Sequence, residues 1–117
     1  MKTGDILVYS YGYDATYVEF YQVVDTNGKS AILREIASKV VSDLATDLYP
    51  DTLNIRKDYI VRRLVAVKDE FIGDLFRKRI VISRNREHVK IGNHRSISVS
   101  DYAYIWNGRP ESYSDGY

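Results

Sequence analysis

The Asn27-Gly28 dipeptide, which stands between two apolar runs, is the strongest constraint on how this chain can fold. Asn-Gly in such a setting is the typical signal of a β-hairpin. The run before it, Tyr17–Val24, is rich in β-branched and aromatic residues, which favour strands. The run after it is Ser30–Ile36. The turn therefore predicts two adjacent antiparallel strands.

The length of the hairpin loop decides which residues face each other across the two strands. A two-residue loop would set Phe20 opposite Glu35. A three-residue loop, Thr26 to Gly28, keeps even-numbered residues together and gives Gly28 the left-handed position of a bulge. We expect this second register. One face then holds Val18, Phe20 and Gln22 of the first strand with Ile32, Arg34 and Ile36 of the second.

The segment from Ser30 to Tyr49 fits two kinds of secondary structure. Its apolar residues recur at close to helical spacing behind Ser30, a residue type that caps helices, so alone it predicts an amphipathic helix. The preceding turn instead makes residues 30–36 the return strand of the hairpin. We combine the two and expect a strand over 30–36 and a short helical insertion over 38–48, which ends before Pro50.

Further apolar stretches, separated by turns, predict the remaining strands. They are Ile6–Val8, Tyr59–Val67, Lys78–Ser83 (with Ile80 and Ile82 inward), His88–Ile91 and Ser96–Trp106. Many short strands with turns between them are typical of a small barrel or sandwich. We predict a mostly β fold with a minor helical part, a small SH3-like or related β-barrel. One domain covers residues 1–107, and regular structure ends before a polar C-terminal tail over 108–117.

Composition excludes several classes of protein. The chain has no cysteine, which removes disulfide scaffolds, thiol catalysis and cysteine zinc sites. No apolar run approaches the roughly 20 residues of a membrane helix, and the N-terminus lacks the apolar core of a signal peptide. We expect a soluble intracellular protein.

Motifs for catalysis and cofactor binding are also missing. The sequence contains no Gly-x-Ser-x-Gly elbow and no glycine grouping that binds phosphate. His88 and His94 have no acidic or histidine partner at ligand spacing, so we predict no metal and no cofactor. A Ser-His-Asp triad can still assemble from distant residues, but the sequence favours a protein that is not an enzyme.

Charge is concentrated in one segment, although the formal net charge is only +1. Residues 77–95 hold seven Lys or Arg residues and one acid. Basic side chains on strands with aromatic rings nearby are typical of nucleic-acid binding, and basic residues also protect edge strands. The nucleic-acid-binding candidates are Arg77, Lys78, Arg79, Arg84, Arg86 and Lys90.

Tyrosine is the most unusual feature of the composition, with eleven Tyr against three Phe and one Trp. Tyr and Trp dominate the hot spots of protein interfaces, and Tyr also suits the half-buried face of a strand. If the N-terminal strands pair with the C-terminal strand, two tyrosine groups form one patch. The protein-binding candidates are Tyr9, Tyr11, Tyr13, Tyr17, Tyr102, Tyr104 and Trp106.

Several short motifs together resemble a group of small, functionally uncharacterised proteins from bacteriophages and bacterial mobile elements. These motifs are Gly4-Asp5-Ile6, Gly12-Tyr13-Asp14-x-Thr16, Phe20-Tyr21-Gln22-Val23, Arg34-Glu35-Ile36, Val67-Lys68-Asp69-x-Phe71-Ile72-Gly73, Arg77-Lys78-Arg79, Val89-Lys90-Ile91 and Trp106-x-Gly108-x-Pro110. The resemblance covers most of the chain and thins over residues 43–58.

The resemblance implies a phage or mobile-element origin, a location in the cytoplasm of a bacterial host cell, and no catalytic residue. From it we expect a non-catalytic accessory protein that binds a host or phage protein, with inhibition of a bacterial defence system as one version. The alternative is a small nucleic-acid-binding barrel that uses residues 77–95.

Overall fold

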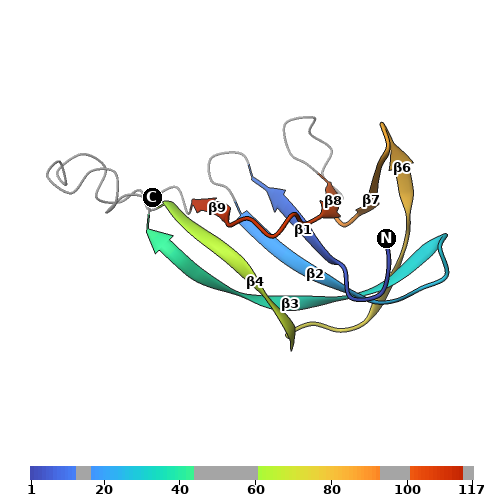
Figure 1. Cartoon of the computed structure of the whole chain (residues 1–117), viewed down its shortest axis with the longest axis horizontal. Coiled ribbons are helices and arrows are strands. Elements are labelled where there is room, and N and C mark those ends of the chain that lie inside the picture. The colour runs from blue at the N-terminus through green and yellow to red at the C-terminus, as the bar shows by residue number, and fades with distance from the viewer. Residues whose placement is uncertain (13–16, 44–60, 93–100, 115–117) are drawn as a thin grey trace, which may run out of the picture.

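The computed structural model describes residues 1–12, 17–43, 61–92 and 101–114 (Figure 1). In these ranges the chain forms a mostly β structure of antiparallel strands in one curled sheet. The strands are β1 (Ile6–Tyr11), β2 (Tyr17–Thr26), β3 (Ser30–Asp43), β4 (Val61–Phe71), β5 (Phe76–Arg79), β6 (Val81–Ser83), β7 (Arg86–Lys90), β8 (Tyr102–Ile105) and β9 (Glu111–Ser114). This part of the chain contains no helix able to cross a membrane.

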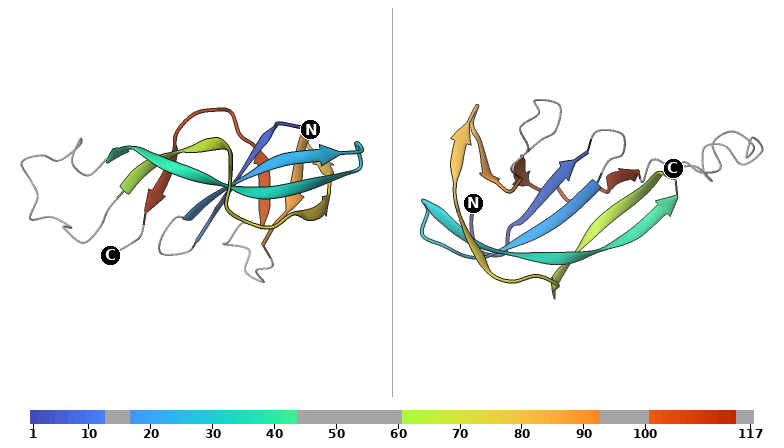
Figure 2. Two further views of the ribbon diagram at one scale, coloured as in Figure 1. Left: turned by 90° about the horizontal axis from the view of Figure 1, so that it is seen from below. Right: turned by 180° about the vertical axis from the view of Figure 1, so that it is seen from behind.

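The long strand β3 organises the sheet. The strand order is β6-β7-β8-β1-β2-β3-β4-β9, and β5 pairs with β3 off this path. β5 pairs with the first residues of β3, while β4 pairs with the rest of that strand. Only Ile80 separates β5 from β6. The strand that pairs with β3 therefore runs almost directly into the strand that pairs with β7. This connection curls the sheet into a barrel-like shape (Figure 2).

The predicted hairpin is present, but its register differs from the expected one. Phe20 pairs with Ile36, whereas a three-residue loop would pair Phe20 with Arg34. The turn closes between Asn27 and Ser30, with Gly28 at a φ of 89°. The extra residue is a bulge in β2, where the register shifts between Val23 and Asp25, and not at Gly28.

The face that we expected the two hairpin strands to share is nevertheless formed in part. Phe20 lies opposite Ile36 and Gln22 lies opposite Arg34, so these four residues share one face. The reason is that the observed register differs from the expected one by two residues, so even-numbered residues still lie opposite even-numbered residues. Ile32, beyond the bulge, pairs instead with Asp25.

The helical insertion expected over 38–48 is wrong where the structure describes it. β3 continues to Asp43, and residues 44–48 lie outside the described residues. β4 supplies the ladder partners, with Val40 opposite Leu64, so a tertiary contact overrides the local helical pattern. Val40 and Val41 contributed to that pattern, yet they are 53% and 47% exposed, so they do not mark a buried helix face.

Two other details of the C-terminal half differ from expectation. The strand predicted over Lys78–Ser83 is divided into β5 and β6, and although Ile80 is buried as predicted, Ile82 is 68% exposed. Regular structure does not end before residue 108, because β9 lies within the predicted tail and pairs with β4. The strand predicted over Ser96–Trp106 is described only in part, as β8, since residues 96–100 lie outside the described ranges.

Apolar side chains pack on both faces of the central strands. The inner core is enclosed by the curl and consists of Leu7, Tyr9, Tyr21, Val23, Ala31, Leu33, Ile80, Val89 and Ala103. The second core lies on the opposite face and consists of Phe20, Ile36 and Leu64, with Trp106 packed against it. Successive residues of a strand point to opposite faces. Because Val89 and Ala103 point into the inner core, their neighbours on β7 and β8 point outward.

Candidate nucleic-acid interface

The outer faces of β7 and β8 form one surface. His88 pairs with Tyr104 and Lys90 pairs with Tyr102, while the residues between them, Val89 and Ala103, belong to the inner core. Alternation therefore places five residues on the outer side. We call these the basic-aromatic face: Arg86, His88, Lys90, Tyr102 and Tyr104.

Ring contacts hold this face in a defined geometry. The Arg86 guanidinium carbon lies 4.0 Å from the centroid of the Tyr104 ring, a cation–π arrangement. The His88 ring lies 5.1 Å from the Tyr102 ring and 5.2 Å from the Tyr104 ring, between centroids. His88 is only 6% exposed and its Nδ1 lies 3.2 Å from the Arg86 carbonyl oxygen. His88 thus supports the two tyrosines, and Tyr102 remains 41% exposed.

The charge of the basic-aromatic face is not neutralised by the part of the chain that the structure describes. Within it, the one ion pair joins the N-terminal ammonium to Glu87 Oε1. Glu87 alternates with Arg86 and His88 along β7 and so lies on the opposite side. The described ranges also hold no group of three or more His, Asp or Glu residues able to bind a metal.

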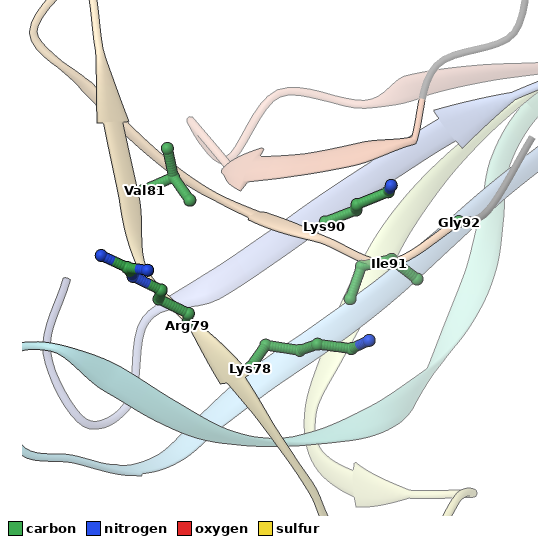
Figure 3. A pocket seen from close by; sticks show the side chains of 6 residues that line it. All are labelled: Lys78, Arg79, Val81, Lys90, Ile91 and Gly92. Atoms are coloured by element: carbon green, nitrogen blue, oxygen red, sulfur yellow. The ribbon is translucent and has the colours of Figure 1, made fainter.

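A pocket of about 430 Å³ adjoins this face, between β5 and β7 (Figure 3). Its lining residues are Lys78, Arg79, Val81, Lys90, Ile91 and Gly92. Figure 3 shows the Lys78 and Lys90 side chains extending to the same side, with Ile91 between them, while Arg79 extends the other way. Lys90 therefore belongs both to the pocket and to the basic-aromatic face.

The six basic candidates are divided among four places. Lys78, Arg79 and Lys90 line the pocket, and Arg86 lies on Tyr104. Arg77 donates a hydrogen bond of 3.0 Å to the Ser30 hydroxyl on the neighbouring strand. Arg84 lies in the turn between β6 and β7 at a φ of 52°. The structure thus brings some of these side chains together but does not gather all six on one face.

The tyrosine and tryptophan candidates do not form a single patch. β1 pairs with β8, as that patch required, but Val8 and not Tyr9 lies opposite Tyr104. Tyr9 is 3% exposed and belongs to the inner core. Tyr11 stacks on Tyr9, with the ring centroids 4.7 Å apart, and the Tyr17 ring lies 5.5 Å from Tyr11. These three therefore lie on the face opposite to Tyr104, and Tyr13 lies outside the described residues.

Trp106 also has a packing role. Its ring lies 5.1 Å from the Phe20 ring, between centroids, in an edge-to-face arrangement within the second core. Its backbone N–H donates to the Ile6 carbonyl oxygen at 2.7 Å, which ties the segment after β8 to β1. Trp106 is thus a structural anchor on the second core.

A cluster of tyrosines around Glu19 occupies the inner side of β1 and β2. Glu19 accepts hydrogen bonds from the Tyr11 hydroxyl at 3.1 Å and from the Tyr21 hydroxyl at 2.5 Å. Burial, helped by the Glu19 charge, raises the pKa of Tyr11 to about 12 and also raises the pKa of Tyr21. Glu35, paired with Tyr21 across the strands, has a raised pKa because of burial first and the Glu19 charge second. These tyrosines are therefore neutral hydrogen-bond donors at pH 7.

Four residues of the interface and its pocket are not candidates in the sequence: Val81, His88, Ile91 and Gly92. The sequence presents His88 only as a possible metal ligand, and Val81 and Ile91 only as strand residues. Tyr102 and Tyr104 were expected to bind protein, not to share a face with Arg86. The alternation of Arg86, His88 and Lys90 is the signal that would have identified the face, once the segment is assigned to a strand.

No family model, no curated protein and no solved structure matches this chain. The resemblance to phage and mobile-element proteins therefore stays a prediction. The function has to be inferred from the geometry of the candidate surfaces.

Proposed function

We propose that the protein is a non-catalytic binding protein that holds single-stranded nucleic acid on the basic-aromatic face. One observation carries the proposal: the Arg86 guanidinium lies 4.0 Å over the Tyr104 ring, next to Tyr102 and Lys90 on the same outer face. The exposed Tyr102 ring and the half-buried Tyr104 ring, with its Arg86 guanidinium, offer stacking platforms to bases, and Arg and Lys neutralise phosphates. The proposal thus joins two groups of candidates that had been assigned to different partners.

The geometry of the face favours single strands over duplexes. Tyr102 and Tyr104 are two residues apart on one strand, so their α-carbons are separated by roughly 7 Å along β8. Bases can stack on such rings only when they are not stacked in a duplex. No helix among the described residues projects from the sheet to enter a major groove. The proposal includes a more specific fold, a small SH3-like or related barrel. Small barrels of this kind bind oligonucleotides on their strands.

A host or phage protein is the second candidate partner, through the exposed tyrosines. Tyr17 and Tyr102 are 40% and 41% exposed, which suits interface residues. They lie on opposite faces of the sheet, however, so one partner could not cover both in a compact interface. Inhibition of a bacterial defence system, phage origin and a cytoplasmic location stay predictions within this alternative.

Binding of a fluorescent single-stranded 20-mer, followed by anisotropy between 50 and 200 mM salt, tests the first proposal. Replacing Arg86 or Lys90 by Gln should each weaken binding and lower the slope of log K against log salt by about 0.7. Tyr104→Ala should weaken binding by about 1–3 kcal/mol, roughly 5- to 150-fold, since a stacking ring is lost.

Lys39→Gln is the matched control, because Lys39 is exposed on the distant half of β3 and its loss removes the same charge. This variant should bind within about twofold of the parent. Absence of binding at 50 mM salt, or equal losses for Lys39→Gln and Lys90→Gln, contradicts the proposal.

A further inference from the structure

The pocket between β5 and β7 lies at a break in the sheet. Val81 pairs with His88 in the ladder between β6 and β7, so the same register, continued past Ile80 and Val89, would pair Arg79 with Lys90 and Lys78 with Ile91. These pairs are not formed: β5 pairs with β3 on its other edge, and β7 pairs with β6 and β8. The four residues that would have closed the sheet line the pocket instead. We call this break the seam.

Backbone donors face the seam from both sides. The Ile91 N–H donates to the Asp101 carbonyl oxygen at 2.8 Å, beside β8. Alternate residues of an antiparallel strand direct both their N–H and their C=O to opposite neighbours, so the Lys90 N–H points toward the seam together with the Lys90 C=O. In the same way the Ile80 N–H donates to the Lys29 carbonyl oxygen at 2.9 Å, on the β3 side, which directs the Arg79 N–H toward the seam.

The side chains around the seam are basic. Lys78 and Lys90 extend to the same side of the pocket, and no Asp or Glu is among its lining residues. In the part of the chain that the structure describes, neither lysine forms an ion pair. Gly92 carries no side chain at the end of the pocket, next to Ile91. Two ammonium groups with backbone N–H donors nearby form a suitable environment for an anion of charge −2.

We infer that the seam binds a terminal phosphate monoester, the end group of the single strand that the basic-aromatic face holds. This inference rests on the proposed function. A monoester carries close to two negative charges at neutral pH and matches Lys78 and Lys90, whereas an internal phosphodiester carries one. Lys90 lies on both surfaces, so the end of a strand stacked on Tyr102 and Tyr104 can reach the seam.

The test compares one single-stranded 20-mer in three forms, with a 5′-phosphate, with a 3′-phosphate or with hydroxyl groups at both ends. One of the phosphorylated forms should bind about 5- to 10-fold more tightly than the hydroxyl form at 50 mM salt, as expected for one or two charge-assisted hydrogen bonds. Lys78→Met should remove this difference, because the phosphorylated form should lose more affinity than the hydroxyl form does. Methionine keeps an apolar stem of similar length, and Lys39→Met is the matched control, which should keep the difference.

The outcomes separate this inference from the proposed function. If all three forms bind equally well, the inference is overturned and the proposed function stands. If no form binds, amide shifts of Lys90, Ile91 and Gly92 are followed by NMR while a nucleoside monophosphate and inorganic phosphate are added. If these amide signals shift although no strand binds, the seam binds phosphate but not the end of a nucleic-acid strand. If they do not shift, the phosphate site itself is contradicted. A retained amide spectrum for Lys78→Met, or for Lys78→Gln in its place, verifies that the variant is folded.

Discussion

Gln22 and Asp69, which are 47 positions apart in the chain, exchange two hydrogen bonds. The Gln22 Nε2 donates to Asp69 Oδ1 at 2.8 Å, and the Gln22 Oε1 accepts from the Asp69 backbone N–H at 2.8 Å. Gln22 is 6% exposed, and Asp69 has a φ of 67°, in the left-handed region. The pair therefore holds the irregular end of β4, where the register with β3 shifts between Ile36 and Ser38, against β2.

Removing the Gln22 amide should destabilise the protein. Gln22→Ala deletes both hydrogen bonds and leaves the Asp69 carboxylate and N–H without this partner, so the free energy of unfolding should fall by about 2–3 kcal/mol. Urea unfolding followed by circular dichroism measures it.

Asp69→Asn is the informative control for this pair. Asparagine keeps the acceptor oxygen and tolerates a positive φ, so its effect should stay below about 1 kcal/mol. Asp69→Val, a β-branched residue at the same φ, should be clearly more destabilising than Asp69→Asn. If all three variants are as stable as the parent protein, this contact is not important for the fold.

Trp106 should contribute to stability through the second core. Trp106→Ala removes the ring that packs on Phe20 and the Nε1 donor that bonds the Arg109 carbonyl oxygen at 2.8 Å. We expect a loss of about 2–4 kcal/mol, below the value for a fully buried Trp because this side chain is only partly buried. Trp106→Phe keeps the ring contact and should cost about 1 kcal/mol.

The same residue gives a direct spectroscopic test. The chain has one Trp, so its fluorescence reports only on the second core. Its emission should shift to longer wavelength in the same urea transition that circular dichroism detects. A red-shifted emission already present in the native protein would contradict the packing of Trp106 on Phe20.

Local patterns in the sequence predicted the mostly β class and most of the strands. Asn27-Gly28 identified the hairpin because a turn of this kind depends on nearby residues alone. The register was missed because the extra residue lies in β2, at a bulge that no residue type marks. The helix predicted over 38–48 is wrong in its described part, 38–43, because the ladder partner of Val40 is Leu64, 24 positions away, and such a contact leaves no local signal.

The candidate surfaces were predicted by residue type but not by arrangement. Arg86, Lys90, Tyr102 and Tyr104 were all identified, yet the basic and aromatic residues were assigned to different partners. Only the pairing of β7 with β8 places them on one face. The seam could not be predicted, since it results from a ladder that stops after Val81 and His88.

Stability should depend on pH through Glu35. Burial and the Glu19 charge raise the folded-state pKa of Glu35 above its unfolded value. The folded state therefore holds this proton more tightly, and the contribution of Glu35 to stability falls as pH rises through the folded-state pKa. At pH 7 the charged carboxylate is destabilising, so Glu35→Gln should raise the melting temperature there. The increase should shrink as pH falls below the folded-state pKa toward pH 4, and an increase of equal size at both pH values would contradict this origin.

The turn between β6 and β7 offers a way to stabilise the protein without touching the proposed interface. Arg84 and Asn85 have φ values of 52° and 62°, which is the pattern of a type I′ turn. Asn and Gly adopt these values more easily than Arg and Asn do, so Arg84→Asn with Asn85→Gly should raise the free energy of unfolding by about 1 kcal/mol. Arg84 lies outside the seam and the basic-aromatic face, so the double variant should bind the 20-mer within about threefold of the parent. A larger loss of affinity would place Arg84 in the interface and extend it to the tip of the hairpin.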